Sequence, residues 1–168
     1  WSPDSSELLV LVNEEGTVHL ARVSRADGTV EKLTEGVMSI NTFSVDASFE
    51  KVVVTMEDDT KPNDLYLVDL EGETPLELQR LTEVNEAILS RIELTSPERF
   101  KVPVGERFTI DTWLIPPVDR EPGKKYPVIL YAGGGPGGMR ASVFCHEFHM
   151  YAAQGYAVLH CNARGNYG

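Results

Sequence analysis

A repeat of about 42–48 residues runs through the first half of the chain and limits how this half can fold. Each unit has short segments rich in β-branched residues, separated by turn residues, as is typical of antiparallel strands. A period of this length predicts one four-stranded β-propeller blade per unit, with a small β-sandwich as the alternative. The repeated pieces are Trp1-Ser2-Pro3-Asp4 with Phe43-Ser44-Val45-Asp46, 8–12 with 52–56, 18–23 with 64–69, and Leu33-Thr34-Glu35 with Leu81-Thr82-Glu83.

The aromatic-Ser-x-Asp sequence that opens each unit predicts a turn, because Ser and Asp side chains accept hydrogen bonds from nearby backbone N–H groups. Only about two units are present, whereas a closed propeller has 4–8 blades. Two blades alone would leave strand edges uncovered. We therefore expect the repeat to belong to a longer polypeptide with further blades before Trp1.

Charge changes along the chain near residue 98. Residues 1–98 carry 21 acidic and 7 basic side chains, and residues 99–168 carry 5 acidic and 8 basic ones, within a net charge of −11. Such a shift indicates a domain boundary. The acidic balance also argues against binding to nucleic acid, whose phosphates repel it. No apolar run approaches the length of a membrane helix, so no membrane partner is expected.

The second half has the pattern of an α/β domain. Residues 108–115 predict a strand, and the apolar runs 128–132 and 156–161 predict parallel strands buried on both faces. Between these runs, residues 142–154 predict a helix that stops at Gly155. Strand, helix and strand form a βαβ unit, which begins an α/β sheet.

A glycine-rich loop, residues 133–138, follows the first of these buried strands. Glycines there expose backbone N–H groups that can stabilise a developing oxyanion, as in α/β-hydrolases. Gly133, Gly135 and Gly138 also fit the dinucleotide pattern G-x-G-x-x-G, but Pro136 interrupts it and no acidic residue for a ribose follows the next strand. A glycine turn without a ligand is the third reading, and no cofactor is expected.

Three smaller features have structural interpretations. His146 and His149 lie three residues apart but do not form a His-Glu-x-x-His motif, so we expect packed or solvated helix positions and no metal site. The acidic run 57–59 predicts a solvated turn. Two cysteines make no disulfide framework, so we expect Cys145 and Cys161 to be reduced and buried in a cytoplasmic protein.

Several short motifs occur in an order that resembles the prolyl oligopeptidase family of serine peptidases, nearest its acylaminoacyl-peptidase-like branch. They are the blade openings with Leu-Thr-Glu, Ser96-Pro97-Glu98, 124–130, Gly134-Gly135-Pro136, 151–158 and Asn162-x-Arg164-Gly165. The resemblance implies that residues 1–97 are approximately the last two blades of an antiparallel β-propeller. It implies that residues 98–168 begin the parallel sheet of an α/β-hydrolase domain and stop before its nucleophile.

The resemblance also sets expectations for the site. The family's nucleophile lies in a Gly-x-Ser-x-Gly-Gly elbow, which no serine of this chain matches, so no member of the catalytic triad is expected here. Family members place Tyr or His before Gly-Gly-Pro, whereas this chain has Gly133. The oxyanion-loop candidates are therefore Tyr131, which should share a strand face with position 133, and the backbone of Gly133 and Gly134. Arg164 could bind a carboxylate, but the family implies that it organises a loop near the active site.

The expected function is that of a serine peptidase that hydrolyses short peptides through an acyl-enzyme. Acylaminoacyl-peptidase, dipeptidyl-peptidase and oligopeptidase activities all fit, the full-length protein could form a homo-oligomer, and this chain alone should be inactive. Two alternatives stay open: a non-catalytic β-propeller that binds proteins, and an α/β-hydrolase that cleaves esters.

Overall fold

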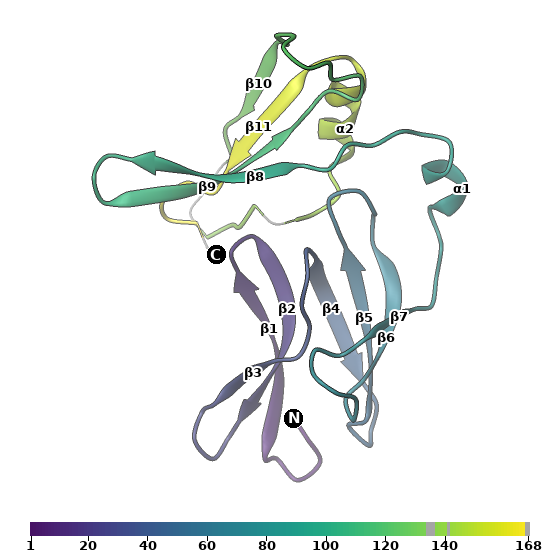
Figure 1. Cartoon of the computed structure of the whole chain (residues 1–168). Helices are drawn as coiled ribbons and strands as arrows, with labels where there is room; N and C mark the ends of the chain where they lie inside the picture. The colour runs from purple at the N-terminus through teal and green to yellow at the C-terminus, as the bar shows by residue number, and fades with distance from the viewer. Residues whose placement is uncertain (134–136, 141, 167–168) are drawn as a thin grey trace.

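The computed structural model describes residues 1–133, 137–140 and 142–166. Within these residues the regular secondary structure is mostly β-strand and forms two sheets, with the second sheet above the first in Figure 1. The first sheet contains β1 (Glu7–Glu14), β2 (Thr17–Ser24), β3 (Val30–Lys32), β4 (Ser39–Val45), β5 (Lys51–Glu57), β6 (Asp64–Asp69) and β7 (Leu78–Arg80). The second contains β8 (Glu98–Val104), β9 (Phe108–Ile115), β10 (Val128–Tyr131) and β11 (Ala157–Cys161). The short α1 (Glu86–Leu89) lies between the sheets in sequence, and α2 (His146–Ala153) connects β10 to β11.

The first sheet consists of two antiparallel groups of strands. β2 pairs with β1 on one side and β3 on the other, while β4, β5, β6 and β7 pair in chain order. A single parallel pairing, Val18 with Ser39, joins β2 to β4. This grouping confirms the antiparallel strands that the repeat predicted.

The two threonines of the Leu-Thr-Glu motif have the same role in both groups. Thr34 Oγ1 accepts a hydrogen bond from the N–H of Leu20 at 3.1 Å, and Thr82 Oγ1 accepts one from the N–H of Leu65 at 2.9 Å. Leu20 therefore corresponds to Leu65, a spacing of 45 residues. The expected alignment of 18–23 with 64–69 was wrong by one residue, because apolar residues lie on both faces of these strands and their alternation does not single out one register.

The turns before β1 and β5 confirm the prediction from Ser and Asp. Asp4 Oδ1 accepts from the N–H of Ser6, and Asp46 Oδ1 accepts from the N–H groups of Glu50 and Lys51. The side chain of Asp4 also accepts from the hydroxyl of Ser2, and these bonds lower its pKa to about 2. The carboxylates thus cap the turns in place of backbone partners.

The apolar side chains of the first sheet form one core across both groups of strands. Burial of this continuous cluster is the main force that holds the groups together. Its buried members are Leu9, Leu20, Leu33, Ile40, Val52, Val54, Tyr66, Val68, Leu70 and Leu76.

The second sheet has the strand order β10-β11-β9-β8. β10 pairs with β11 in parallel, as the βαβ pattern predicted, whereas β11 with β9 and β9 with β8 are antiparallel. β10 is an edge strand in this chain, and its Val128 and Leu130 side chains are 59% and 65% exposed. The expectation that run 128–132 is buried on both faces was therefore wrong, since α2 packs only on the face that carries Tyr131.

The helix α2 begins at His146, four residues later than expected. Cys145, directly before it, is extended, and two N–H groups of the preceding segment bond outside the helix: Ser142 donates to the carbonyl of Gly16 and Phe144 donates to Glu57 Oε2. Gly155 ends the helix as predicted, with φ of 84°. The N–H of Tyr156 reaches back to the carbonyl of Tyr151, which is the Schellman pattern.

None of the helices in the described part of the chain is long and apolar enough to cross a membrane.

Candidate functional site

The glycine-rich loop begins directly after β10, at the carboxyl end of the strand. Gly133 and residues 137–138 are described, whereas Gly134, Gly135 and Pro136 lie outside the described residues. The N–H of Gly137 donates to the carbonyl of Gly165 at 3.4 Å. The loop is thereby joined to the segment after β11, so that the carboxyl ends of the two parallel strands meet, as expected for neighbours in a parallel sheet.

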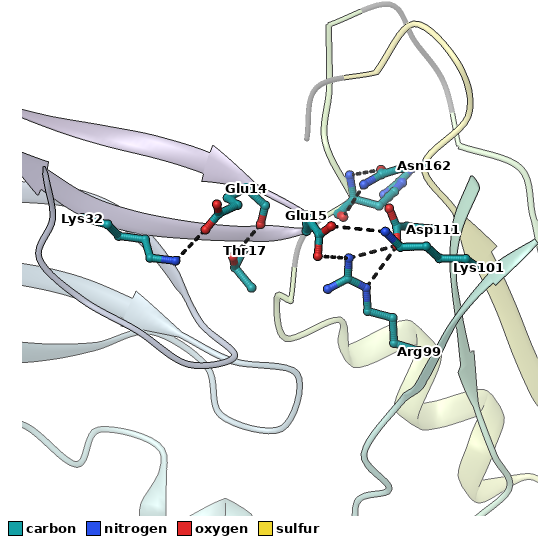
Figure 2. Close-up of polar contacts among 9 residues, drawn as sticks. Glu14, Glu15, Thr17, Lys32, Arg99, Lys101, Asp111 and Asn162 are labelled. Atoms are coloured by element: carbon teal, nitrogen blue, oxygen red, sulfur yellow. Dashed lines mark hydrogen bonds and ion pairs between the residues drawn. The ribbon is translucent and has the colours of Figure 1, made fainter. Parts of the chain in front are cut away.

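The main chain of Arg140, just after the loop, is fixed by the side chain of Asn162. The N–H of Arg140 donates to Asn162 Oδ1 at 2.6 Å, and Asn162 Nδ2 donates to the carbonyl of Arg140 at 3.0 Å. The side chain of Asn162 therefore satisfies both backbone groups at once, and Asn162 is only 9% exposed. Figure 2 shows Asn162 where the loop segments meet the second sheet.

The guanidinium of Arg140 contacts the start of the glycine-rich loop. Its Cζ lies 4.7 Å from the centroid of the Tyr131 ring, a cation–π arrangement. A Cβ added to Gly133 would lie 2.8 Å from Arg140 Nε and 2.9 Å from Nη2. Because one guanidinium contacts both residues, Tyr131 and Gly133 face the same side, as strand alternation predicted. A side chain at position 133 would displace the guanidinium from the place it occupies here.

A column of aromatic rings runs from Tyr131 across the second sheet. The Tyr131 ring meets the edge of Phe148 at 5.0 Å, and Phe148 stacks on His160 at 5.2 Å. His160 in turn stacks on Trp113 at 5.3 Å, with 2° between the ring planes. These contacts connect α2, β11 and β9, so the ring of Tyr131 is held by packing rather than by its hydroxyl.

His160, in the middle of this column, is held neutral at physiological pH. It is 5% exposed, and burial lowers its pKa to about 4, with a smaller contribution from the positive charge of Arg140. Its Nδ1 has no hydrogen-bond partner among the described residues. A charged imidazole would be costly in this position, so His160 serves as a flat aromatic ring.

The turn between β1 and β2 touches the second sheet beside this column. Glu15 forms ion pairs with Arg99 at 3.4 Å and with Lys101 at 3.2 Å, both on β8 (Figure 2). The next residue, Gly16, has φ of 79° and lies against the ring of Trp113. Its carbonyl accepts the hydrogen bond from Ser142 at 2.7 Å. One short turn of the first sheet therefore contacts β8, β9 and the segment before α2.

The acidic run 57–59 makes a second contact between the sheets, so its interpretation as a solvated turn was wrong. Glu57 accepts from the N–H of Phe144, and the carbonyl of Asp59 lies 2.7 Å from Nε2 of His149. Burial, with a smaller effect of the neighbouring Asp58, raises the pKa of Asp59 to about 6. The sequence could not place this run against α2, because only the fold brings the two together.

A cavity of about 150 Å³ lies where these contacts meet. Asp59, from the loop between β5 and β6, lines it together with polar, aromatic and apolar residues of the second half of the chain: Pro97, Ile115, Arg140, Val143, Phe144, Cys145, Phe148, His149 and His160. His149 is 6% exposed and packs on Phe144, in agreement with a packed helix position. Within residues 1–133, 137–140 and 142–166, no group of three or more His, Cys, Asp or Glu side chains is placed to hold a metal ion.

Arg164 is exposed and lies in the segment after β11. Its guanidinium lies 5.5 Å from the centroid of the Phe108 ring and lines a shallow hollow with Asn162 and Asn166. Both cysteines are free, but each is half-buried rather than buried as expected. The role of Arg164 as an organising residue stays a prediction.

Sequence reasoning missed Arg140 as a site residue and treated Asn162 only as part of a motif. Two signals point to them in retrospect. Arg140 is the first basic residue after the glycine-rich loop, and Asn162 is a polar residue directly after a buried strand. A polar side chain at that position must find backbone partners, since unpaired buried groups are costly.

No family model matches the chain. Its curated relatives include the uncharacterized peptidase YuxL of Bacillus subtilis, which is 28% identical over 168 residues, covering 100% of this chain and 25% of the relative. Dipeptidyl-peptidase 5 of Porphyromonas gingivalis is 28% identical over 167 residues, covering 98% of this chain and 24% of the relative. The solved structure of Pyrococcus horikoshii acylaminoacyl peptidase superposes with a TM-score of 0.82 at 30% identity, covering 98% of this chain and 24% of that protein.

The chain thus spans about a quarter of the length of the curated relatives it matches. The likeness extends over nearly all of its own length, and the relatives named above are peptidases. Sequence and fold together identify this chain as matching a segment of the prolyl oligopeptidase family of peptidases.

Proposed function

We propose that the chain is part of a serine peptidase that hydrolyses short peptides through an acyl-enzyme, of the acylaminoacyl- or dipeptidyl-peptidase type. The likeness to peptidases over 98–100% of the chain carries the proposal. It favours a peptidase over an esterase and over a propeller that only binds proteins. Short peptides are the proposed substrates, and the cytoplasm is the proposed location.

In this proposal the two sheets belong to two domains, residues 1–97 and 98–168. The strands β4 to β7 would be one complete propeller blade, and β1 to β3 would be three strands of the preceding one. The hydrogen bonds of Thr34 and Thr82, which repeat at equivalent places, support two equivalent blades. The parallel pair β10 and β11, joined through α2, would begin the α/β-hydrolase sheet.

The reaction requires an attacking serine that this chain lacks in the Gly-x-Ser-x-Gly-Gly context. The serine oxygen would bond to the substrate carbonyl carbon, and negative charge would develop on the carbonyl oxygen. Breaking the carbon–nitrogen bond would release the amine, and water would then hydrolyse the acyl-enzyme. The chain alone should therefore be inactive.

The contribution of this chain would be support for the oxyanion. Tyr131 and the backbone N–H groups of Gly133 and Gly134 are the proposed donors, because the loop follows the carboxyl end of β10. Arg164 would keep the neighbouring loop in place. The propeller would restrict entry to small, flexible peptides.

The proposal is tested on the full-length protein with a fluorophosphonate probe and matched peptide and ester substrates. We expect one serine to be labelled, peptides to be hydrolysed faster than esters, and the 168-residue chain to remain unlabelled. Replacement of the labelled serine by alanine is the control and should abolish both signals. A full-length protein that neither reacts with the probe nor hydrolyses peptides would contradict the proposal.

A further inference from the structure

Arg140 carries a positive charge that no described residue neutralises. Its guanidinium forms no ion pair and no hydrogen bond within residues 1–133, 137–140 and 142–166. Arg140 is intermediate in exposure, so part of the residue is open to solvent. The residue is nevertheless half-buried, where a charge-assisted hydrogen bond to an anionic oxygen is stronger than at the open surface.

The position of this guanidinium is fixed from three sides. Asn162 holds the main chain of Arg140 with two hydrogen bonds, the Tyr131 ring supports one face of the guanidinium, and Gly133 leaves room for it. An arginine held in this way loses little conformational freedom when it binds a ligand. Five N–H donors are then presented at the first residue of the glycine-rich loop.

The surroundings of the guanidinium suit an anionic oxygen. Arg140 lines the cavity of about 150 Å³ at the junction of the two sheets, with Cys145, Phe148 and the neutral His160 beside it. Asp59 lines the same cavity, and its raised pKa weakens its competition for the guanidinium below about pH 6. A charge-assisted, bidentate contact is the interaction that arginine makes best.

We propose that Arg140 is a substrate-binding residue of this peptidase site and that its guanidinium takes an anionic oxygen of the peptide. This inference rests on the proposed function. Two oxygens share the required chemistry: the carbonyl oxygen that becomes negative when the serine attacks, and the carboxylate at the end of a short peptide. Asn162 is the residue that positions Arg140 for this contact.

The test compares Arg140→Met, which removes the charge and keeps the length, with Arg140→Lys and with Asn162→Ala in the full-length protein. The matched control is Arg107→Met, because Arg107 is an exposed arginine in the β8–β9 turn without an ion pair among the described residues. Each variant is assayed on one peptide with a free carboxylate and on the same peptide with an amide end.

If the oxyanion is the ligand, Arg140→Met lowers kcat about 100- to 1,000-fold on both peptides with little change in KM, as for loss of an oxyanion donor. If the terminal carboxylate is the ligand, KM rises about 10- to 100-fold for the free acid only. Asn162→Ala should change the same kinetic constant, kcat or KM, in the same direction but by a smaller factor. Arg140→Lys should show a smaller loss than Arg140→Met, because lysine keeps the positive charge. Unchanged kcat and KM in a folded Arg140→Met protein would overturn the inference.

A second readout does not depend on turnover. Phenylglyoxal modifies accessible arginines, and mass spectrometry can follow Arg140 and Arg107 in the same sample. An N-acetylated dipeptide acid or a peptide aldehyde should protect Arg140 and leave Arg107 reactive. If the unmodified protein shows no peptidase activity but Arg140 is protected, the proposed function fails and the anion site stands. If the protein has peptidase activity but neither compound protects Arg140 from phenylglyoxal, the anion site is overturned and the proposed function stands.

Discussion

Gly16 lies so close to the ring of Trp113 that a Cβ at this position would be 2.8 Å from Cη2 and closer still to Cζ2. Gly16 belongs to the turn between β1 and β2 in the first sheet, and Trp113 belongs to β9 in the second. The contact therefore depends on a residue without a side chain, and neighbouring bonds from Ser142 and Glu15 complete it.

We predict that Gly16→Ala lowers the free energy of unfolding by about 2–4 kcal/mol, because it combines a positive φ with overlap of the Trp113 ring. Gly28→Ala is the matched control, since Gly28 has φ of 74° and no atom within 4 Å of the added Cβ. Gly28→Ala should lower the free energy of unfolding by only about 1–2 kcal/mol, because only the positive φ disfavours alanine there. Urea unfolding measures both, and equal losses would show that the close approach is unimportant.

Asn162→Asp should loosen the segment around Arg140. The carboxylate can still accept from the N–H of Arg140, but it cannot donate to the carbonyl, which would face a negative charge. We expect a loss of about 1–3 kcal/mol. Hydrogen exchange should accelerate at residues 137–140, and the matched change Asn13→Asp in β1 should leave that segment unaffected. Unchanged exchange at 137–140 would contradict the role of Asn162.

Asp59→Asn should stabilise the protein at neutral and alkaline pH. The pKa of Asp59 rises from 3.8 unfolded to about 6 folded, so its carboxyl favours folding below pH 3.8 and this benefit is lost as the pH rises through 6. Because Asp59 is partly exposed, we expect Asp59→Asn to raise the free energy of unfolding by about 1–2 kcal/mol at pH 8 and to leave it unchanged at pH 3.5. Asp119→Asn, at an exposed acid, is the matched control. Thermal unfolding across this range measures the difference.

His160→Phe should make the protein less sensitive to acid. The pKa of His160 falls from 6.5 unfolded to about 4 folded, so its contribution to stability is complete above pH 6.5 and is lost as the pH falls towards 4. Phenylalanine keeps the stack between Trp113 and Phe148 and cannot be protonated. The free energy of unfolding of the variant, relative to that of the parent, should therefore be about 1–3 kcal/mol higher at pH 4 than at pH 7. His146→Gln, at an exposed position, is the control, and parallel pH curves for parent and His160→Phe would contradict the prediction.

Local patterns predicted the strands and turns of this fold well. The Asp46 turn, the Gly155 helix end and the parallel pairing of β10 with β11 follow from residue chemistry within short segments. The strand β8 and the late start of α2 at His146 could not be predicted from short segments. Both depend on partners far away in sequence, since β8 exists through its pairing with β9 and the segment before α2 bonds to Gly16 and Glu57.

The candidate site was only partly predictable for the same reason. The glycine-rich loop and Tyr131 were recognisable as candidates because they are contiguous in sequence and the loop directly follows an apolar strand segment. Arg140 and Asn162 are 22 residues apart, and their bonds arise only when the carboxyl ends of β10 and β11 come together. The contact of Asp59 with His149 spans 90 residues and requires both sheets.

The exposed outer face and free edge of β10 have a practical consequence. Among the described residues no strand pairs with the outer edge of β10, so its N–H and C=O groups next to Val128 and Leu130 form a template to which a strand of another molecule can add. Handled at high concentration, the 168-residue polypeptide should self-associate through this edge. Leu130→Lys should keep it dispersed without disturbing the face that holds Tyr131.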